Sequence, residues 1–123
     1  MNNKEKISKY FENLSNGNYS DLMKLFEEGA IVFSPLYGKR LAKEFYKELI
    51  GDSNSSSTVD LIHAFIEGNK GAGNFKYSWT LKNGSKSSFE GVDLFEFSNE
   101  GKIKQIKIIY DTFGTRNNFV KMK

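Results

Sequence analysis

The stretch EGVDLFEFSNEG (Glu90–Gly101) places a carboxylate among aromatic side chains. Successive side chains of a β-strand point to opposite faces, so Asp93, Phe95 and Phe97 share one face of the strand that alternation predicts here. A carboxyl group on an apolar face loses its hydration, which raises its pKa and favours the neutral acid. A protonated carboxyl donates a hydrogen bond, which an ionised one cannot do. Asp93 is therefore the first candidate for a functional side chain.

His63 is the only histidine, and its ordinary pKa suits a general base at neutral pH. It lies in VDLIHAFIE, where alternation predicts one strand face shared by Val59, Leu61, His63 and Phe65. Two interpretations stay open for this residue. It is either a proton acceptor at a site or a half-buried residue of the sheet without a chemical role.

Asp111, at the end of the last predicted strand, is a second candidate base. Alternation puts it on the face of Ile109 and away from Ile106 and Tyr110, which are expected inside. A β-bulge would reverse this arrangement. The alternative, which we favour, is a strand-end carboxylate that pairs with Arg116 on the surface.

The composition excludes several kinds of chemistry. There is no cysteine, so disulfides, thiolate nucleophiles and cysteine metal ligands are ruled out. A single histidine without a carboxylate at i, i+4 gives no metal-ligand set. Neither a phosphate-binding glycine motif nor a nucleophilic serine motif occurs. We therefore expect neither a metal nor a cofactor.

The formal net charge of +3 is spread along the chain, and uncharged residues interrupt its tightest basic group, Lys102, Lys104 and Lys107. Nucleic-acid binding needs a concentrated basic surface, so no nucleic-acid partner is expected. The N-terminal segment MNNKEKISKY has no apolar leader, and no apolar run approaches the length of a membrane span. These features predict a cytoplasmic protein without a membrane partner.

The elements that position these residues follow from hydrophobic periodicity. The residues Ile7, Tyr10, Phe11 and Leu14 form a stripe that predicts a helix over residues 5–15. A short second helix is expected to start at Ser20 and to end at Gly29. A strand over residues 30–38 and a third helix over about 40–50 complete the first half of the chain.

A polar loop over residues 51–58, which has no reason to pack, precedes a change of period to two. Strands are predicted at 58–67, 74–81, up to 97 and 102–112, with GNKGAGN as a turn region. The expected fold is a single α+β domain over residues 1–123, with three N-terminal helices packed on a strongly curved antiparallel sheet of four to five strands. Such a sheet, closed by helices, would leave an aromatic-lined cavity suited to a small molecule.

At this level the chain resembles the NTF2-like superfamily, whose cone-shaped, cystatin-like fold is shared by ketosteroid isomerases and SnoaL-like polyketide cyclases. The resemblance rests on KYFENLSNGNYSDLMKLFEEGAIVFSPLYG and GVDLFEFSNEGKIKQIKIIYD. These segments match the superfamily's first helix, its NxGD-like break and its D-x-F-x-F…G-K-I hairpin, and the likeness extends over nearly the whole chain. Because this fold hosts many chemistries and several non-enzymes, the resemblance implies the fold and leaves the function to the site.

The ketosteroid-isomerase pattern carries over at two of three positions. Tyr10 matches its oxyanion-hole tyrosine and Asp93 its oxyanion-hole carboxylic acid, whereas Ser34 stands where that family has its general base. The resemblance thus implies that Tyr10 and Asp93 hold a carbonyl oxygen as negative charge develops on it, with His63 or Asp111 as an unassigned base. The alternative is that Tyr10 and Asp93 form a structural polar pair in the core.

The expected ligand is a small, largely apolar carbonyl or hydroxyl compound, with isomerase, cyclase or dehydratase chemistry through an enolate. Beyond the candidate donors and bases, the residues expected to line its pocket are Ser34, Trp79, Phe95, Ile106 and Tyr110. Two other functions stay open, a non-catalytic ligand carrier or sensor and a dimeric protein-interaction module. The resemblance also implies a homodimer that forms through the outer face of the sheet.

Overall fold

The computed structural model describes residues 1–123 as four helices and six strands. The helices are α1 (Asn3–Ser15), α2 (Tyr19–Met23), α3 (Ala42–Asp52) and α4 (Arg116–Met122). The strands are β1 (Phe26–Ser34), β2 (Gly38–Leu41), β3 (Thr58–Glu67), β4 (Lys70–Thr80), β5 (Lys86–Phe97) and β6 (Ile103–Ile109). The predicted α+β fold, with three helices ahead of the long strands, is confirmed.

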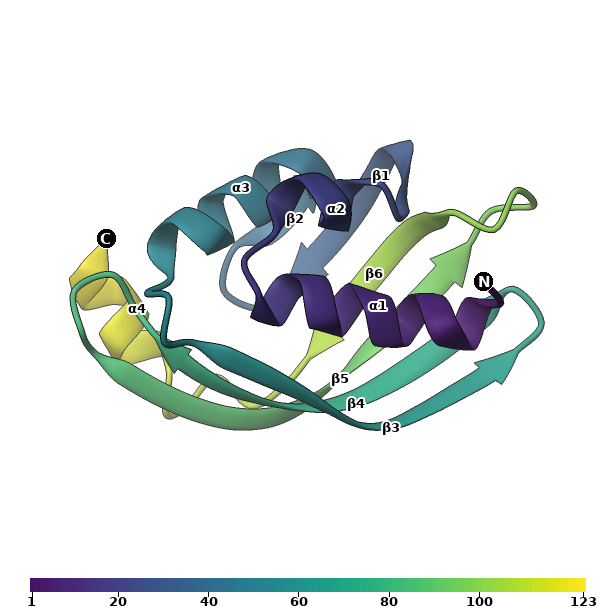
Figure 1. The fold of residues 1–123 in the computed structure, drawn as a ribbon. Coiled ribbons are helices and arrows are strands. Elements are labelled where there is room, and N and C mark those ends of the chain that lie inside the picture. Colours follow the sequence, from purple (N-terminus) through teal and green to yellow (C-terminus); the bar gives the residue numbers. More distant parts are fainter.

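All six strands form one curved sheet in the order β2-β1-β6-β5-β4-β3. The pairs are antiparallel except β1 and β6, which run parallel. Parallel neighbours need a long connection, and here it consists of β2, α3 and three further strands. The expectation of a wholly antiparallel sheet is wrong at this junction. Figure 1 shows α1, α2 and α3 on the concave side of the sheet, and α4 at one end of it. These layers enclose one core of 23 buried apolar residues.

Helix α1 packs closely on the inner face of the sheet because two glycines of β4 remove side chains from its path. A Cβ atom on Gly73 would lie 2.7 Å from Cε2 of Phe11, and one on Gly71 would lie 2.8 Å from Cδ1 of Ile7. Only glycine permits this approach of helix to strand. The segment GNKGAGN, expected as a turn region, turns at residues 68–69 alone and continues as β4.

The second helix is shorter than the sequence predicts. Helix α2 ends at Met23, and β1 already begins at Phe26. Gly29, expected to end the helix, has a φ of 82° within β1, where the pairing with β6 is interrupted between Phe26 and Ile31. A helix end and an irregular strand both use glycine with positive φ, which is why the sequence pattern does not separate them.

Strand β2 and helix α4 are absent from the sequence-based prediction, so the sheet has six strands in place of four to five. The four residues of β2 are all exposed, and they follow a turn in which Oγ of Ser34 accepts hydrogen bonds from the backbone N–H groups of Leu36 and Tyr37. Helix α4 buries no residue completely and has no side-chain cap. Neither element therefore carries the apolar period on which the prediction relied.

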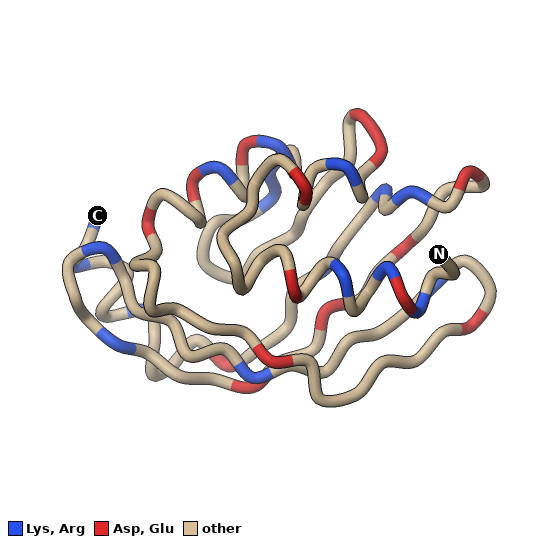
Figure 2. Tube along the Cα trace, viewed as in Figure 1, with Lys and Arg blue, Asp and Glu red and all other residues tan.

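Charged residues of both signs lie close together along most of the chain. Figure 2 shows lysine and arginine interspersed with aspartate and glutamate on the helices and on the sheet. None of the helices combines the length and the apolar character that crossing a membrane requires.

Helix α4 is attached to the end of the sheet through aromatic contacts. The ring of Phe119 lies edge-on to Tyr37, with 4.9 Å between the ring centroids, and tilted against Trp79 at 6.4 Å. The ammonium group of Lys123 lies 2.9 Å from a carboxylate oxygen of Glu48 on α3. The C-terminal segment thereby covers the end of the sheet at which Tyr37 and Trp79 lie.

A buried carboxylate, Asp52, completes this attachment. It accepts a hydrogen bond from the hydroxyl of Tyr37 at 2.8 Å, and it pairs with Lys123 at 2.6 Å and Lys82 at 3.3 Å. Burial alone would raise the pKa of Asp52, but the bonds from Lys123, Tyr37 and Lys82 outweigh burial and hold this pKa below its ordinary value. Asp52 is therefore an ionised carboxylate with three partners.

We predict that Asp52→Asn lowers the free energy of unfolding by about 2–4 kcal/mol at pH 7, because it removes a buried charge that two lysines share. A lowered pKa stabilises the fold above the unfolded-state value of about 3.9 and stops doing so as the pH falls through the folded-state value. The difference between variant and wild type should therefore shrink toward pH 3.

Urea denaturation of the wild type and the variant at pH 7 and pH 3 measures this difference. Asp60→Asn is the matched control, because Asp60 is exposed on β3 and makes no ion pair. Equal losses at the two pH values would contradict the assignment of an ionised Asp52.

Candidate functional site

Asp93 lies at the centre of the inner face of the sheet and is 2 % exposed. The alternation predicted for β5 is confirmed, since Phe95 and Phe97 are buried on the same face and Leu94 is exposed on the other. The carboxylate oxygen Oδ1 of Asp93 is buried without a hydrogen-bond partner. Buried polar atoms are nearly always paired, so this oxygen marks a place where a partner belongs.

Two tyrosine hydroxyl groups meet beside this carboxyl group. Tyr10 from α1 and Tyr46 from α3 share a hydrogen bond of 2.5 Å, and both residues are fully buried. The Tyr10 ring is held edge-to-face by Phe11 at 4.8 Å and by Phe95 at 5.2 Å. Tyr46 was not a candidate from the sequence. Its position one turn after Ala42 on the buried stripe of α3 is the signal that could have identified it.

Burial disfavours the ionised form of all three groups. Burial raises the pKa of Asp93 well above its ordinary value, and the Tyr10 hydroxyl, which acts in the opposite direction, does not offset it. Burial also raises the pKa of Tyr10, with further contributions from Tyr46 and Asp93, and it raises the pKa of Tyr46. The tyrosine pair uses one of its two hydroxyl protons internally. One tyrosine proton and the carboxyl proton of Asp93 therefore remain as donors.

A small cavity lies next to these donors, and we call it the aromatic cavity. Its volume is about 40 Å³, enough for a few atoms without rearrangement. Of the 15 residues that line it, 14 are hydrophobic, and Asp93 is the exception. The others are Tyr10, Phe11, Leu14, Leu36, Tyr37, Phe45, Leu49, Val59, Phe75, Tyr77, Trp79, Phe89, Ile108 and Tyr110.

The residues expected around the ligand divide between this cavity and other places. Trp79 and Tyr110, like Tyr10 and Asp93, line the aromatic cavity. Phe95 and Ile106 are buried in the core but do not line it. Ser34 is also outside it, because its hydroxyl serves the turn before β2.

His63 is exposed on the outer face of the sheet, so the expected face shared with Val59 and Leu61 is wrong. The register between β3 and β4 shifts between Leu61 and His63. After this irregularity Ala64 pairs with Gly73 and faces α1, whereas His63 and Phe65 are exposed. A single extra residue in a strand reverses every later side chain, and the sequence gives no sign of it.

Asp111 also lies outside the cavity. It is exposed, and its Oδ1 accepts a hydrogen bond from the backbone N–H of Phe113 at 2.9 Å. The favoured pairing with Arg116 is wrong, because Arg116 donates instead to the backbone oxygen of Pro35 at 2.8 Å. The titratable side chains that line the aromatic cavity are then Asp93 and four tyrosines. Nowhere do three or more His, Asp or Glu side chains gather in a way that could hold a metal ion.

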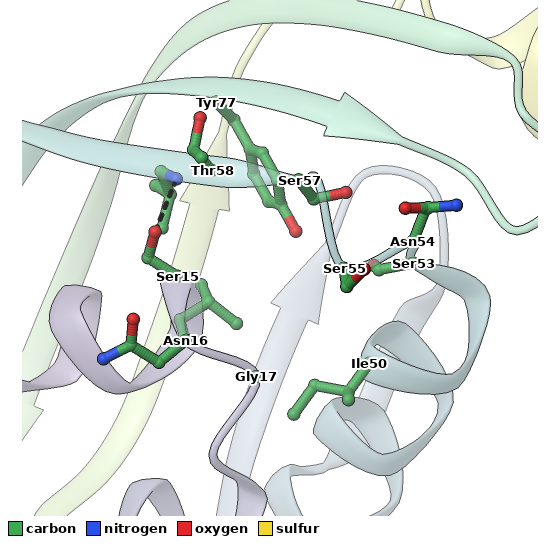
Figure 3. Close-up of a pocket in the computed structure, with 12 residues that line it drawn as sticks. Ser15, Asn16, Gly17, Ile50, Ser53, Asn54, Ser55, Ser57, Thr58 and Tyr77 are labelled. Carbon is green, nitrogen blue, oxygen red and sulfur yellow. Dashed lines mark hydrogen bonds between the residues drawn. The ribbon is translucent and has the colours of Figure 1, made fainter.

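A second hollow, which we call the serine pocket, lies between the C-terminal ends of α1 and α3, the loop 53–57 and Tyr77 of β4 (Figure 3). Its volume is about 270 Å³. The loop was expected to have no reason to pack, and this is wrong. The backbone N–H of Asn54 donates to the backbone oxygen of Thr80 at 2.7 Å, and Oγ of Ser53 accepts from Nε1 of Trp79 at 2.8 Å.

Comparisons with known proteins agree with this architecture. The model of the SnoaL-like domain matches residues 7–106. Among solved structures, the epoxide hydrolase/cyclase-like enzyme SalBIII, which has a role in pyran ring formation in the polyether salinomycin, is similar with a TM-score of 0.76 and 20 % identity over 91 % of this chain and 92 % of that one.

An NTF2-like protein of unknown function from Cytophaga hutchinsonii has a TM-score of 0.75 and 18 % identity over 97 % of this chain and 96 % of that one. AclR, a putative hydroxylase from Streptomyces galilaeus, has a TM-score of 0.78 and 12 % identity over 97 % of this chain and 81 % of that one. No curated protein matches the sequence. At these identities the solved structures support the fold alone, and the family follows from the match over residues 7–106: the chain belongs to the SnoaL-like domain family of the NTF2-like superfamily.

Proposed function

We propose that the protein binds a small, largely apolar carbonyl or hydroxyl compound and places an oxygen atom of that compound against Asp93 and Tyr10. The observation that supports this proposal is the partnerless Oδ1 of Asp93 beside an otherwise apolar cavity. Leaving a buried polar atom unpaired costs about 1–3 kcal/mol, and a ligand oxygen would remove this cost. The surrounding rings would bind the apolar part of the same ligand.

The chemistry that suits this arrangement is the stabilisation of an oxygen atom on which negative charge develops. Two neutral donors in an apolar surrounding are worth more to such an oxygen than they would be in water, about 3 kcal/mol for each donor. His63 and Asp111 are exposed and neither lines the cavity, so neither is in place as a base. A ring closure in which a substrate hydroxyl adds to a carbon–carbon double bond conjugated with the bound carbonyl suits the site better than the enolisation of an unactivated substrate. The new C–O bond forms as the π bond breaks, the negative charge moves to the oxygen held by Asp93 and Tyr10, and the hydroxyl proton ends on the enolate carbon, so no separate base is consumed.

The second candidate function is a non-catalytic carrier or sensor, in which the same oxygen is bound and nothing reacts. The lack of a base in the cavity favours this alternative, and the donors favour catalysis. Both functions require the oxygen to be held by Asp93 and Tyr10, so tests of binding come first.

We predict that Asp93 keeps its proton at pH 7. A ¹³C titration of the carboxyl groups, with Asp93→Asn for assignment, should find the signal of Asp93 in its protonated position at pH 7. Because the folded state then binds more protons than the unfolded state, the free energy of unfolding should fall as the pH rises above about 4, by up to about 1.4 kcal/mol per pH unit. Asp93→Asn should remove this slope, whereas Asp60→Asn should leave it. A signal that titrates below pH 4 would overturn the neutral acid.

A separate prediction concerns 4-nitrophenol, a hydroxyl compound whose absorbance reports binding. Asp93→Leu and Tyr10→Phe should each weaken its binding about 10- to 100-fold, because each removes one hydrogen bond to the bound oxygen. Tyr19→Phe is the matched control, since the Tyr19 hydroxyl donates to the backbone oxygen of Lys43 outside the cavity. Equal affinities for the wild type and both site variants would show that the oxygen is held elsewhere.

We also propose that two copies pair through the outer face of the sheet. Phe65 is 66 % exposed and Leu94 is 42 % exposed, and both pair with Ala72, so they form one row across β3, β4 and β5. Ile109 is 45 % exposed and pairs with Val92 in the next row. A two-fold axis lays such a patch against itself and removes apolar area from water on both copies.

Phe65→Glu should therefore weaken self-association by at least about 10-fold, because it places a charge in an apolar interface. Sedimentation velocity of wild type and variant over a range of concentrations measures the change. Val120→Glu provides the control, since Val120 is 61 % exposed on α4, away from the sheet face. A wild type that sediments as a monomer at every concentration would refute the pairing.

A further inference from the structure

The serine pocket borders the aromatic cavity, and three residues line both. Leu14, Val59 and Tyr77 belong to the walls of the two hollows. Within the core the Tyr77 ring lies 6.1 Å from that of Trp79 and 5.5 Å from that of Phe89, measured between centroids. Figure 3 shows its hydroxyl group directed into the serine pocket. The side chain of Tyr77 therefore separates the apolar aromatic cavity from the polar serine pocket.

The serine pocket is polar without being charged. None of its 12 lining residues is Asp, Glu, Lys, Arg or His, and seven carry a hydroxyl or amide side chain in addition to Tyr77. Burial raises the pKa of Tyr77 to about 12, with the Ser53 hydroxyl acting in the opposite direction, so Tyr77 is neutral too. A compartment of this kind offers hydrogen bonds to uncharged hydroxyl, ether or amide groups and offers no ion pair to an acid or an amine.

Some of these polar groups already have partners and others are free for a ligand. Oγ of Ser57 donates to the backbone oxygen of Thr80 at 2.8 Å and accepts from its N–H at 2.9 Å, so this residue only forms the wall. Oγ of Ser15 accepts from the backbone N–H of Val59 at 3.2 Å, which leaves its own proton free. The side chains of Ser55 and Thr58 are exposed at the mouth and make no hydrogen bond within the protein.

The two hollows also differ in size. The aromatic cavity holds about 40 Å³, and Phe119 of α4 packs on Tyr37 and Trp79 of its wall. The serine pocket holds about 270 Å³ and is bordered by exposed residues of α1 and of the loop. Pockets for small molecules begin at roughly 300 Å³, so neither hollow alone is complete for a ligand of ordinary size.

We propose that the two hollows form one binding site for an elongated, uncharged amphipathic molecule. Its apolar end, which carries a carbonyl or hydroxyl oxygen, passes Tyr77 to reach Asp93, and its hydroxylated end stays in the serine pocket. Tyr77 is the residue that selects for such a molecule, since its ring contacts the apolar part and its hydroxyl bonds to the polar part. This inference rests on the proposed binding of an oxygen at Asp93 and adds the class of ligand.

Two phenols that differ only at the para position test the proposal. Arbutin carries an uncharged glucosyloxy group para to its phenolic hydroxyl, and 4-methoxyphenol carries a methoxy group in its place. Isothermal titration should find that the wild type binds arbutin about 10-fold more tightly, from one or two additional neutral hydrogen bonds. Chemical shifts of the backbone amides of Asn16, Gly17 and Ser55 should respond to arbutin and not to 4-methoxyphenol.

The variants separate this inference from the function on which it rests. Tyr77→Phe keeps the ring and removes the hydroxyl, so it should weaken the binding of arbutin about 3- to 10-fold and leave the binding of 4-methoxyphenol unchanged. Asp93→Leu should weaken the binding of both phenols by the same factor. If neither phenol binds, or if Asp93→Leu changes neither affinity, the proposed function fails. The two-compartment site is refuted if the affinity for 4-methoxyphenol depends on Asp93 but arbutin binds no more tightly. It is also refuted if Tyr77→Phe lowers the affinity for both phenols alike. In either case the oxygen site at Asp93 stands.

Discussion

Burial away from water and from cations favours the protonated form of a carboxyl group, and Asp93 lies in such a place. Its oxygen Oδ1 has no partner, and its neighbours are aromatic rings and the hydroxyl groups of two tyrosines. None of these neighbours supplies the positive charge that would favour a carboxylate, so burial decides the protonation state. The neutral acid is also the only form of the side chain that can donate a hydrogen bond. The same burial that costs the fold stability therefore provides the site with its hydrogen-bond donor.

This arrangement requires α1 to lie very close to the sheet, and the sequence of β4 permits it. Gly71 and Gly73 leave room for Ile7 and Phe11 to rest on the strand backbone. Tyr10, the neighbour of Phe11 on the same buried stripe, is thereby carried down to the level of Asp93 on the adjacent strand β5. A Cβ atom on Gly73 would meet the Phe11 ring and one on Gly71 would meet the end of the Ile7 side chain, so the glycines serve the packing of the helix on the sheet and not a turn.

Strict periodicity is what the sequence reveals well. The stripe of α1 and the alternation of β5 led from sequence to the burial of Tyr10 and Asp93, because helix and strand geometry leave no freedom in which residues share a face. The irregular positions were missed for the opposite reason. A bulge after Leu61 turned His63 outward, and Gly29 adopted the same positive φ within a strand that it would adopt at a helix end. Tyr46 was missed because its role arises only where α3 meets α1.

The two buried aspartates of this chain differ in a way that supports the proposed functional interpretation of Asp93. A carboxylate that organises a fold looks like Asp52, which has a tyrosine and two lysines as partners and a pKa below its ordinary value. Asp93 is as deeply buried, at 2 % against 3 % exposure, yet it has a raised pKa and an oxygen without a partner. A leucine there would fill similar space without the cost of burying a polar group. The Oδ1 atom of Asp93 is buried at a cost in stability and has no partner within the protein, which is the argument for the proposed ligand oxygen at this position.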